Sequence, residues 1–381
     1  MKRFALWAAV MAATVAVMAM ARQPEFWKRY GRSLVQGGSQ LPVSFYEPRE
    51  RVEGGNEPPA PRVAPALESL DPAALQIAAD YAAAQGSRAL IVTRHGHIVF
   101  ERYWHGTDFN TLEDSRSFIA TVTALLTGIA IGDRKIGWPD EPVGNFIPEW
   151  SHDARGSITV RNLLKRSSGL APGGSAANPW SVGARARFGP DIAAVHLNQP
   201  LVAKPGEVRT DQPSDPQLLS LVIERAARER FSEYLSEALW RRIGAADGWL
   251  WLDRAAGTAH ADCCFLVRQG DWTRVGELLV DNGRYQGDEV VPPGWVAQML
   301  PPAKKQLMAE AYAAKDLFGI EGGGNRLWLV PSMHLVILRT GPATGDWDDS
   351  RIPNVIIRGA RDYVPPQARP GVDLSTLVPH H

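Results

Sequence analysis

Hydrophobic and polar positions predict a sheet built from both ends of the chain. Residues 89–93 and 97–101 are two apolar, β-branched runs separated by Arg94-His95-Gly96, which is typical of a β-hairpin. Residues 326–330 and 335–339 repeat this pattern close to the C-terminus. The two hairpins therefore predict strands of an antiparallel sheet.

Helical patterns fill the region between the two hairpins. Asp71 followed by Pro72 is an N-cap with proline at the first helical position, and an alanine-rich helix follows to about Gln85. The apolar run Ser117–Ile131 predicts a second helix that ends near Gly132. Shorter helices are expected at residues 158–164, 217–228, 231–242 and 272–280. The pattern predicts an α+β fold, an antiparallel sheet from both chain ends with flanking helices and a mostly helical lobe.

Proline, glycine and charge dominate residues 37–65. Such a composition is not expected to bury a core, so we predict an extended leader that crosses the surface over residues 22–69. The main domain is then expected at residues 70–365, with a C-terminal tail at residues 366–381.

The first 21 residues form a targeting or anchoring segment. Met1-Lys2-Arg3 is basic, Phe4–Ala21 is unbroken and apolar, and Ala19-Met20-Ala21 fits a signal-peptide cleavage site. The apolar run is also close to the length that spans a bilayer, so an uncleaved N-terminal membrane anchor stays open. Both alternatives predict an exported protein, either periplasmic or membrane-anchored and facing the periplasm.

Composition narrows the expected ligands. The formal net charge is zero and no basic cluster is present, which argues against a nucleic-acid partner. The only two cysteines, Cys263 and Cys264, are adjacent, and we expect them to pack as small apolar residues without forming a disulfide. His95, His97 and His105 show no ligand spacing, so no metal site is predicted. No motif indicates a cofactor.

Tryptophan is frequent, with 13 residues in the chain. Trp249 and Trp251 alternate on a predicted strand, which fits core packing or the lining of a cleft. A tryptophan-lined cleft could instead bind an apolar or aromatic ligand, and both interpretations stay open.

The start of the second helix carries the main candidate chemistry. Serine hydrolases with a Ser-x-x-Lys turn place a hydroxyl at a helix start and an amine one turn later, where the amine can accept the hydroxyl proton. Ser117 fits the serine of this pattern, but Ala120 stands at the lysine position.

Further segments follow in a fixed order along the chain. They are Leu125–Ile131, Ile158–Leu164, Ser168-Gly169-Leu170, Pro205-Gly206-Glu207, Asp215–Leu219, Cys263-Cys264, Asp271-Trp272 with Gly276, and Gly319–Pro331. Together with Ser117 they resemble the penicillin-recognising serine hydrolases: class C β-lactamases, their esterase relatives and the 6-aminohexanoate-dimer hydrolases. The resemblance covers about residues 70–363 and implies a β-lactamase/transpeptidase-like fold with Ser117 as the nucleophile.

The sequence differs from this family at the positions of its catalytic acid–base residues. Ala120 replaces the lysine, and Asp211 stands four residues before Asp215, where the family has a tyrosine. The third motif of the family begins with a lysine or histidine followed by small residues. Here it reads Glu321-Gly322-Gly323-Gly324-Asn325, which keeps the glycines and lacks the cation.

These departures predict weak chemistry. A serine hydroxyl needs a base, and general-base help contributes roughly a hundred- to ten-thousand-fold. An oxyanion hole made of the Ser117 amide and an amide from Gly322–Asn325 could still act on an activated ester. Asp211 could replace the base if burial raises its pKa, or it could be a solvated loop residue; Glu321 is a weaker candidate. Ser117 could also be only a helix N-cap.

Two functions therefore remain. One is a serine hydrolase acting on an ester or amide through Ser117, with activity that is weak or lost. The other is a non-catalytic extracytoplasmic binding protein, a pseudoenzyme whose cleft holds a small molecule, a cell-wall fragment or a protein.

Overall fold

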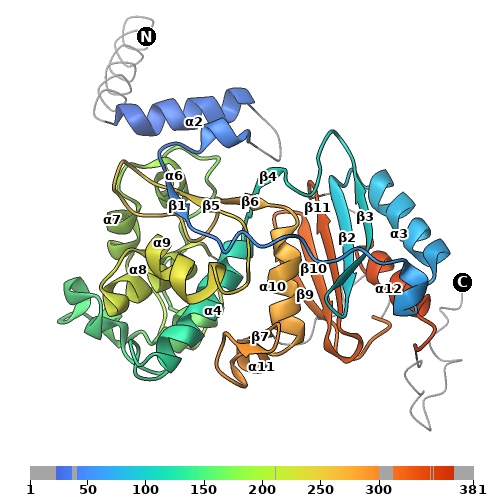
Figure 1. Ribbon diagram of the computed structural model, residues 1–381. Coiled ribbons are helices and arrows are strands. Elements are labelled where there is room, and N and C mark those ends of the chain that lie inside the picture. Colours follow the sequence, from blue (N-terminus) through green and yellow to red (C-terminus); the bar gives the residue numbers. More distant parts are fainter. Residues whose placement is uncertain are drawn as a thin grey trace, which may run out of the picture.

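Two antiparallel sheets form the framework of the protein (Figure 1). The computed structural model describes residues 23–36, 41–210, 212–299, 312–343, 345 and 347–363. The five-stranded sheet has the order β3 (His97–Tyr103), β2 (Ala89–Arg94), β11 (Leu335–Thr340), β10 (Asn325–Val330) and β9 (Phe318–Gly322). The four-stranded sheet has the order β1 (Arg49–Val52), β5 (Gly248–Trp251), β6 (Phe265–Arg268) and β4 (Leu112–Asp114), and β7 (Arg284–Tyr285) pairs with β8 (Asp288–Glu289). The prediction of an antiparallel sheet from both chain ends is confirmed.

Helices cover the sheets and build the lobe between the hairpins. They are α2 (Pro24–Gln36), α3 (Pro72–Ala84), α4 (Phe118–Gly132), α5 (Val160–Leu164), α6 (Val182–Phe188), α7 (Ile192–Leu197), α8 (Ser214–Ala227), α9 (Phe231–Leu235), α10 (Asp271–Val280), α11 (Trp295–Met299) and α12 (Arg351–Arg358). The predicted helices are present, although α9 ends at Leu235 and a π-helical turn, Ser236–Trp240, continues it. Asp71 caps α3 by accepting a hydrogen bond from the Ala73 N–H, as predicted.

The five-stranded sheet is buried on both faces because its inner strands alternate between two cores. In β2, Ile91 belongs to the core shared with α4, whereas Leu90 and Val92 belong to the core under α3 and α12. Helix α10 packs against the first of these faces, and Figure 1 shows it on the side opposite α3. A Cβ atom on Gly276 of α10 would lie 2.4 Å from a methyl group of Val336, so glycine allows this close packing.

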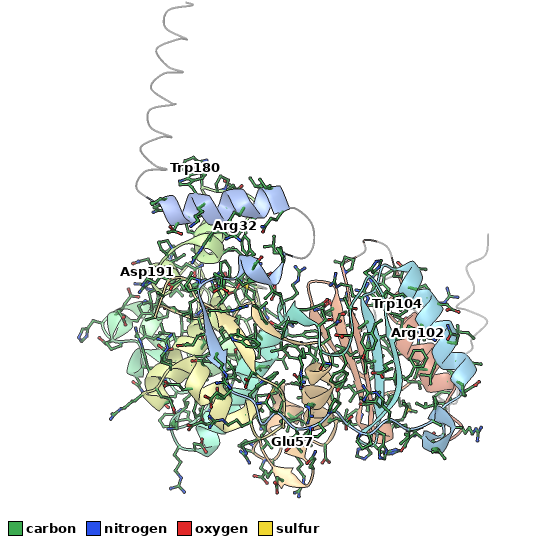
Figure 2. The ribbon with its side chains drawn as sticks, turned by 45° about the horizontal axis from the view of Figure 1, so that its top comes forward. Arg32, Glu57, Arg102, Trp104, Trp180 and Asp191 are labelled. Carbon is green, nitrogen blue, oxygen red and sulfur yellow. A yellow bond between two sulfur atoms is a disulfide. The ribbon has the colours of Figure 1, made fainter. Side chains whose placement is uncertain are left out.

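The prediction of an extended, coreless leader over residues 22–69 is wrong. The segment contains α2, and β1 pairs with β5. Several of its aromatic residues enter one core: Phe45 and Tyr46 are each 1% exposed and pack against Trp251. Trp27 of α2 packs against Trp180 at 5.5 Å between ring centroids, where α2 lies on the helical lobe (Figure 2). Average composition missed this because a handful of aromatic residues suffices to anchor the segment.

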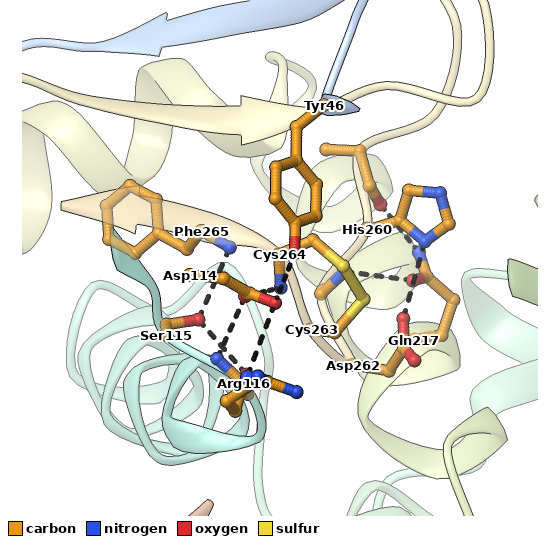
Figure 3. The surroundings of a disulfide bond; sticks show 12 residues. Tyr46, Asp114, Ser115, Arg116, Gln217, His260, Asp262, Cys263, Cys264 and Phe265 are labelled. Carbon is orange, nitrogen blue, oxygen red and sulfur yellow. Dashed lines mark hydrogen bonds and ion pairs between the residues drawn. A yellow bond between two sulfur atoms is a disulfide. The ribbon is translucent and has the colours of Figure 1, made fainter. Parts of the chain in front are cut away.

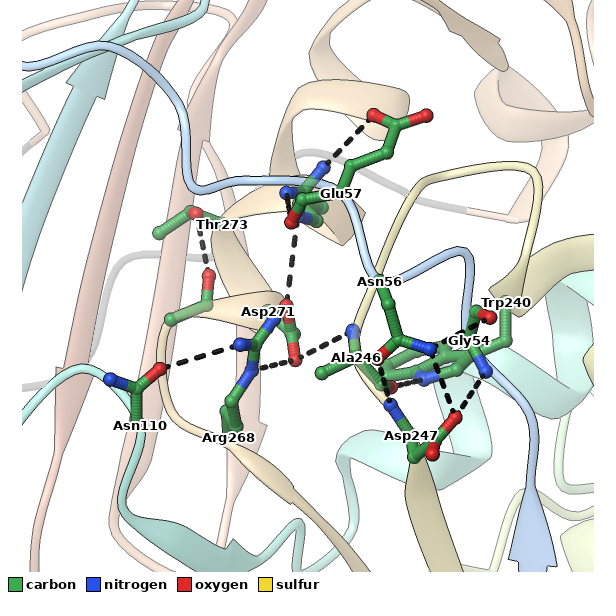
Figure 4. Close-up of polar contacts among 12 residues, drawn as sticks. Gly54, Asn56, Glu57, Asn110, Trp240, Ala246, Asp247, Arg268, Asp271 and Thr273 are labelled. Carbon is green, nitrogen blue, oxygen red and sulfur yellow. Dashed lines mark hydrogen bonds and ion pairs between the residues drawn. The ribbon is translucent and has the colours of Figure 1, made fainter.

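The proline-rich part of this segment is held by polar contacts (Figure 4). The Gly54 N–H donates to Asp247 Oδ1 at 3.0 Å, and the Asn56 N–H donates to the Ala245 carbonyl at 2.9 Å. Arg274 of α10 donates to the Glu57 carbonyl at 3.0 Å. The segment is therefore ordered mainly through its backbone groups.

The expectation that Cys263 and Cys264 do not form a disulfide is also wrong. They are joined to each other by a disulfide, although both are buried as expected. Cys264 has a left-handed backbone with φ of 72°, so the chain turns at this point and the two neighbouring side chains meet. A sequence pattern does not reveal such a turn at a non-glycine residue.

The predicted targeting segment, residues 1–21, and the predicted tail, residues 366–381, lie outside the described residues. Within the described part of the chain, no helix combines the length and the apolar character needed to cross a bilayer.

Gly128 provides a test of the packing of α4. A Cβ atom there would lie 2.4 Å from the indole ring of Trp295, whose N–H donates to the Ala124 carbonyl at 2.9 Å. We expect Gly128→Ala to lower the free energy of unfolding by about 1–3 kcal/mol through overpacking, measured by urea denaturation. Gly31→Ala is the matched control, because no atom lies within 4 Å of its Cβ position on α2. Equal stability of Gly128→Ala and the control would contradict this packing.

Candidate active site

Ser117 stands at the start of α4 with its side chain exposed to solvent. It occupies the N-cap position, but its backbone is helical, with φ of −74° and ψ of 0°, and its side chain makes no capping hydrogen bond. The cap interpretation therefore lacks the hydrogen bond that would support it, and the hydroxyl is accessible.

The residue before Ser117 has an uncommon conformation. Arg116 has φ of 52°, in the left-handed region, and its N–H donates to Asp114 Oδ1 at 2.9 Å. A left-handed conformation costs energy for a residue with a Cβ, and such residues concentrate at functional sites. The side chain of Arg116 extends over Gly323, whose Cβ position lies 3.1 Å from Arg116 Cγ. This turn sets the direction in which α4 and Ser117 begin.

Asp114 holds the turn in place from the interior (Figure 3). It is 3% exposed and also accepts hydrogen bonds from the Tyr46 hydroxyl at 2.9 Å and from the Cys264 N–H at 2.8 Å. Burial, together with Asp114, raises the pKa of Tyr46 far above its ordinary value, so the phenol stays protonated and donates. The loop before Ser117 is thus tied to the leader and to the disulfide turn.

Strand β9 brings the third motif to the same place. A Cβ atom on Gly322 would lie 3.2 Å from the Ser117 nitrogen and 3.2 Å from the Phe118 nitrogen, so glycine is needed for this approach. The Phe118 N–H donates to the Ser115 carbonyl at 3.1 Å. Such closely placed amides are what an oxyanion hole uses. The second N–H donor of that hole, within Gly322–Asn325, stays a prediction.

Two other residues of the third motif, Gly324 and Asn325, stabilise the turn between β9 and β10. Gly324 has φ of 105°, and a Cβ atom there would lie 2.3 Å from the Ala343 nitrogen. Asn325 accepts a hydrogen bond from the Gly341 N–H at 3.1 Å through its side chain. These contacts fix the β9–β10 turn against the end of β11.

Within the described residues, the lysine position of the site holds an alanine. Ala120 lies one turn after Ser117, and its N–H donates to the Ser117 carbonyl at 3.1 Å, so the two side chains share a helix face as predicted. Its methyl group cannot accept a proton. Asp211, the candidate substitute, lies outside the described residues.

Glu321 is not placed to act as the base. It pairs with Arg326 across β9 and β10, and the charged atoms lie 3.7 Å apart. Its strand neighbour Ile320 packs in the same core as Phe118 of α4. Because side chains alternate along a strand, Glu321 points to the opposite face of the sheet from Ser117.

Asp215 connects two of the family-like segments. The Ser168 hydroxyl donates to Asp215 Oδ1 at 2.6 Å, and the Gln212 side-chain amide contacts the same oxygen at 3.4 Å. Burial raises the pKa of Asp215 to about 6. Asp215 therefore fixes the turn at residues 168–170 against the start of α8.

Other candidate groups lie elsewhere. His95 and His97 each contact Glu68 through Nδ1 at 2.7 Å. A cavity of about 500 Å³ lies between residues 58–61, α10 and the β7 turn, and none of the predicted site residues lines it.

Comparison with known proteins gives the family. The Beta-lactamase family model matches residues 76–264. The chain belongs to the β-lactamase-related serine hydrolases. It is 24% identical over 299 residues to the 6-aminohexanoate-dimer hydrolase of Paenarthrobacter ureafaciens, covering 68% of this chain and 74% of that protein.

Solved structures agree on the fold. A Bacillus anthracis protein provisionally named a 6-aminohexanoate-dimer hydrolase superposes with a TM-score of 0.65 at 16% identity, over 83% of this chain and 90% of that one. A family VIII carboxylesterase gives a TM-score of 0.61 at 15% identity, over 78% and 99% of the two chains. The β-lactamase/transpeptidase-like fold predicted from the resemblance is confirmed.

The sequence did not single out Arg116, Asp114 or Tyr46. One local signal was present, because an aspartate two residues before Arg116 is typical of a turn closed by its own side chain. Tyr46 carried no signal, since it lies in the segment predicted to be an extended surface leader.

Asp114 should support the stability of the whole turn. We expect Asp114→Ala to lower the free energy of unfolding by about 3 kcal/mol or more, because three donors lose their acceptor. Asp114→Asn should lose much less, since Oδ1 can still accept both N–H groups and the Tyr46 hydroxyl can reverse its role. Urea denaturation measures both, and equal losses would contradict the acceptor role of Asp114.

Asp215 should make stability depend on pH. Its folded pKa of about 6 exceeds the ordinary value of 3.8, so the folded state holds this proton more tightly than the unfolded state. Its contribution to stability therefore falls as pH rises from about 4 to about 6, by up to about 3 kcal/mol, and is constant above that. Urea denaturation across this pH range should show that the free energy of unfolding falls less steeply with pH in Asp215→Asn than in the parent protein. Substitution of the exposed Asp288 by asparagine should leave the pH dependence of the parent unchanged. An unchanged fall in Asp215→Asn would be evidence against this assignment.

Proposed function

We propose that this β-lactamase-related protein is a serine hydrolase of low turnover, in which Ser117 accepts an acyl group from activated esters. The observation that carries the proposal is the accessible, uncapped Ser117 hydroxyl beside Gly322, with Ala120 in the place of an amine. In this proposal Ser117 is the nucleophile and Gly322 allows the close approach of β9, whereas Ala120 supplies no proton acceptor.

The chemistry follows from these groups. The Ser117 oxygen attacks the ester carbonyl, and the N–H of Ser117 stabilises the oxygen anion that develops. The hydroxyl proton passes to water, because Ala120 offers no acceptor. The tetrahedral adduct then expels the alcohol of the activated ester, and water later cleaves the acyl-Ser117 ester to release the acid. Oxyanion stabilisation alone is worth about 2.7–4 kcal/mol per donor, whereas the missing base forfeits roughly a hundred- to ten-thousand-fold in rate. Activated esters are therefore favoured over amides and β-lactams.

The substrate class and location are part of the proposal. The name of the Paenarthrobacter relative supports a small linear amide or ester, and a cell-wall fragment is a further candidate. We place the protein outside the cytoplasm, either released or held by its N-terminal segment. The Cys263–Cys264 disulfide supports this location, since disulfides persist in oxidising compartments.

Binding without turnover is the second candidate function. Ala120 and the outward-turned Glu321 favour it, because neither can activate Ser117. The region around Ser117 and Gly322 would then bind a ligand without acylation of the serine.

Restoring the missing amine tests the first proposal. We expect the purified protein to react slowly with a fluorophosphonate probe, with an intact-mass shift that Ser117→Ala abolishes. Ala120→Lys places an amine one turn after Ser117 and should raise the labelling rate by about ten- to ten-thousand-fold.

Ala120→Met controls for side-chain length without an amine and should not change the rate. No labelling of the parent and no gain in a folded Ala120→Lys variant would reject Ser117 as a nucleophile. Ligand binding would then be the function to examine.

A further inference from the structure

The turn that carries the disulfide gathers three metal-ligating groups. The ligand atoms of His260, Asp262 and Cys263, here called the His260–Asp262–Cys263 cluster, all lie within 4.8 Å of one another. The cluster lies in the loop between β5 and β6, beside the disulfide (Figure 3).

His260 is the unusual member of this cluster. It is 0% exposed, and neither of its ring nitrogens has a hydrogen-bond partner within the described residues. Its ring stacks on Trp251 at 4.3 Å between centroids, which fixes the plane of the imidazole. Nδ1 lies within ion-pair distance of Asp262, whereas Nε2 has no polar contact within the described residues. Buried polar atoms are nearly always paired, so this nitrogen points to a partner that binds there.

Asp262 supplies an anionic group beside this ring. Its Oδ1 atom lies 3.6 Å from His260 Nδ1, which is longer than a hydrogen bond but within ion-pair distance. The side chain of Asp262 is 15% exposed, so one edge of the cluster reaches solvent.

The backbone of the turn is held on both sides of the cluster. Gln217 of α8 accepts from the Ala261 N–H at 2.9 Å and donates to the Ala259 carbonyl at 2.8 Å. On the other side, the Cys264 N–H donates to Asp114 at 2.8 Å. The ligating side chains are therefore already close together, which lowers the cost of binding an ion.

We propose that reduction of the Cys263–Cys264 disulfide creates a zinc site formed by Cys263, His260 and Asp262. The disulfide takes up two electrons and two protons from a dithiol, which is oxidised to its own disulfide, and two thiols result. The Cys263 thiol then gives its proton to water as its sulfur binds the zinc ion. With the disulfide intact, no thiolate is available and the site is closed.

The ligand set fits zinc. Zn²⁺ binds mixed sulfur, nitrogen and oxygen ligands at about 2.0–2.3 Å in a tetrahedron, so ligand atoms should approach to about 3.3–3.7 Å of one another. The ligand atoms, which now lie within 4.8 Å of one another, would have to move closer by side-chain rotation. Three protein ligands leave the fourth position to water.

Two cysteine variants separate this proposal from its alternatives. Cys264→Ser and Cys263→Ser both remove the disulfide, but only Cys264→Ser leaves the Cys263 thiol free. We expect Cys264→Ser to bind one zinc ion per chain without reductant, measured by competition with a chromophoric chelator. Cys263→Ser and the double variant Cys264→Ser/His260→Gln should bind at least about tenfold more weakly, since loss of even an outer-shell partner costs about ten- to a hundredfold.

Cobalt gives an independent readout. Co²⁺ bound to Cys264→Ser should show a thiolate-to-metal absorption band that is absent in Cys263→Ser. Thermal melts show whether both variants are folded, and the absence of the disulfide from both makes them a matched pair. Equal zinc affinity in the two variants, or no binding to a folded Cys264→Ser, would overturn the proposal.

Discussion

The buried carboxyl group of Asp114 joins three segments that lie far apart in the sequence. It accepts hydrogen bonds from Tyr46 in the N-terminal segment, from the Arg116 amide before α4 and from the Cys264 amide in the β5–β6 turn. A single acceptor thus couples the leader, the nucleophile turn and the disulfide. Because the three donors are backbone or buried groups, they have few alternatives to the two oxygens of this carboxyl group. The left-handed conformation of Arg116, and with it the position of Ser117, depends on this one interaction.

The fold and the loss of catalytic groups illustrate two different constraints. The close approaches at Gly322 and Gly324 are needed for packing, so they remain even where the chemistry has changed. Ala120 lies inside α4, and the helix is regular around it. The shape of the site is thus set by packing, which does not depend on whether a side chain there can accept a proton.

Sequence reasoning succeeded where periodic patterns are strong. The hairpin at residues 89–101, the capped helix α3 and the long apolar helix α4 were all predicted, because each is specified by local spacing and by its termini. The sequence also predicted that Ser117 and the glycines at residues 322–324 belong to one site, and the structure brings Ser117 and Gly322 together. The leader was mispredicted, since its order depends on a few aromatic contacts and on backbone hydrogen bonds to distant residues. The disulfide was missed because it depends on a left-handed turn at Cys264, which no local pattern announces.

The order of strands in the larger sheet also affects how the protein can be made. Strand β2 lies between β3 and β11, and Ala89 pairs with Thr340 across most of the length of the chain. Contacts this distant in sequence slow folding, because a long loop has to close before they form. Until β10 and β11 have been synthesised, the β2 edge of the β2–β3 hairpin therefore has no partner strand. This interval, rather than the folded state, is when the chain is most exposed to aggregation and most in need of a chaperone.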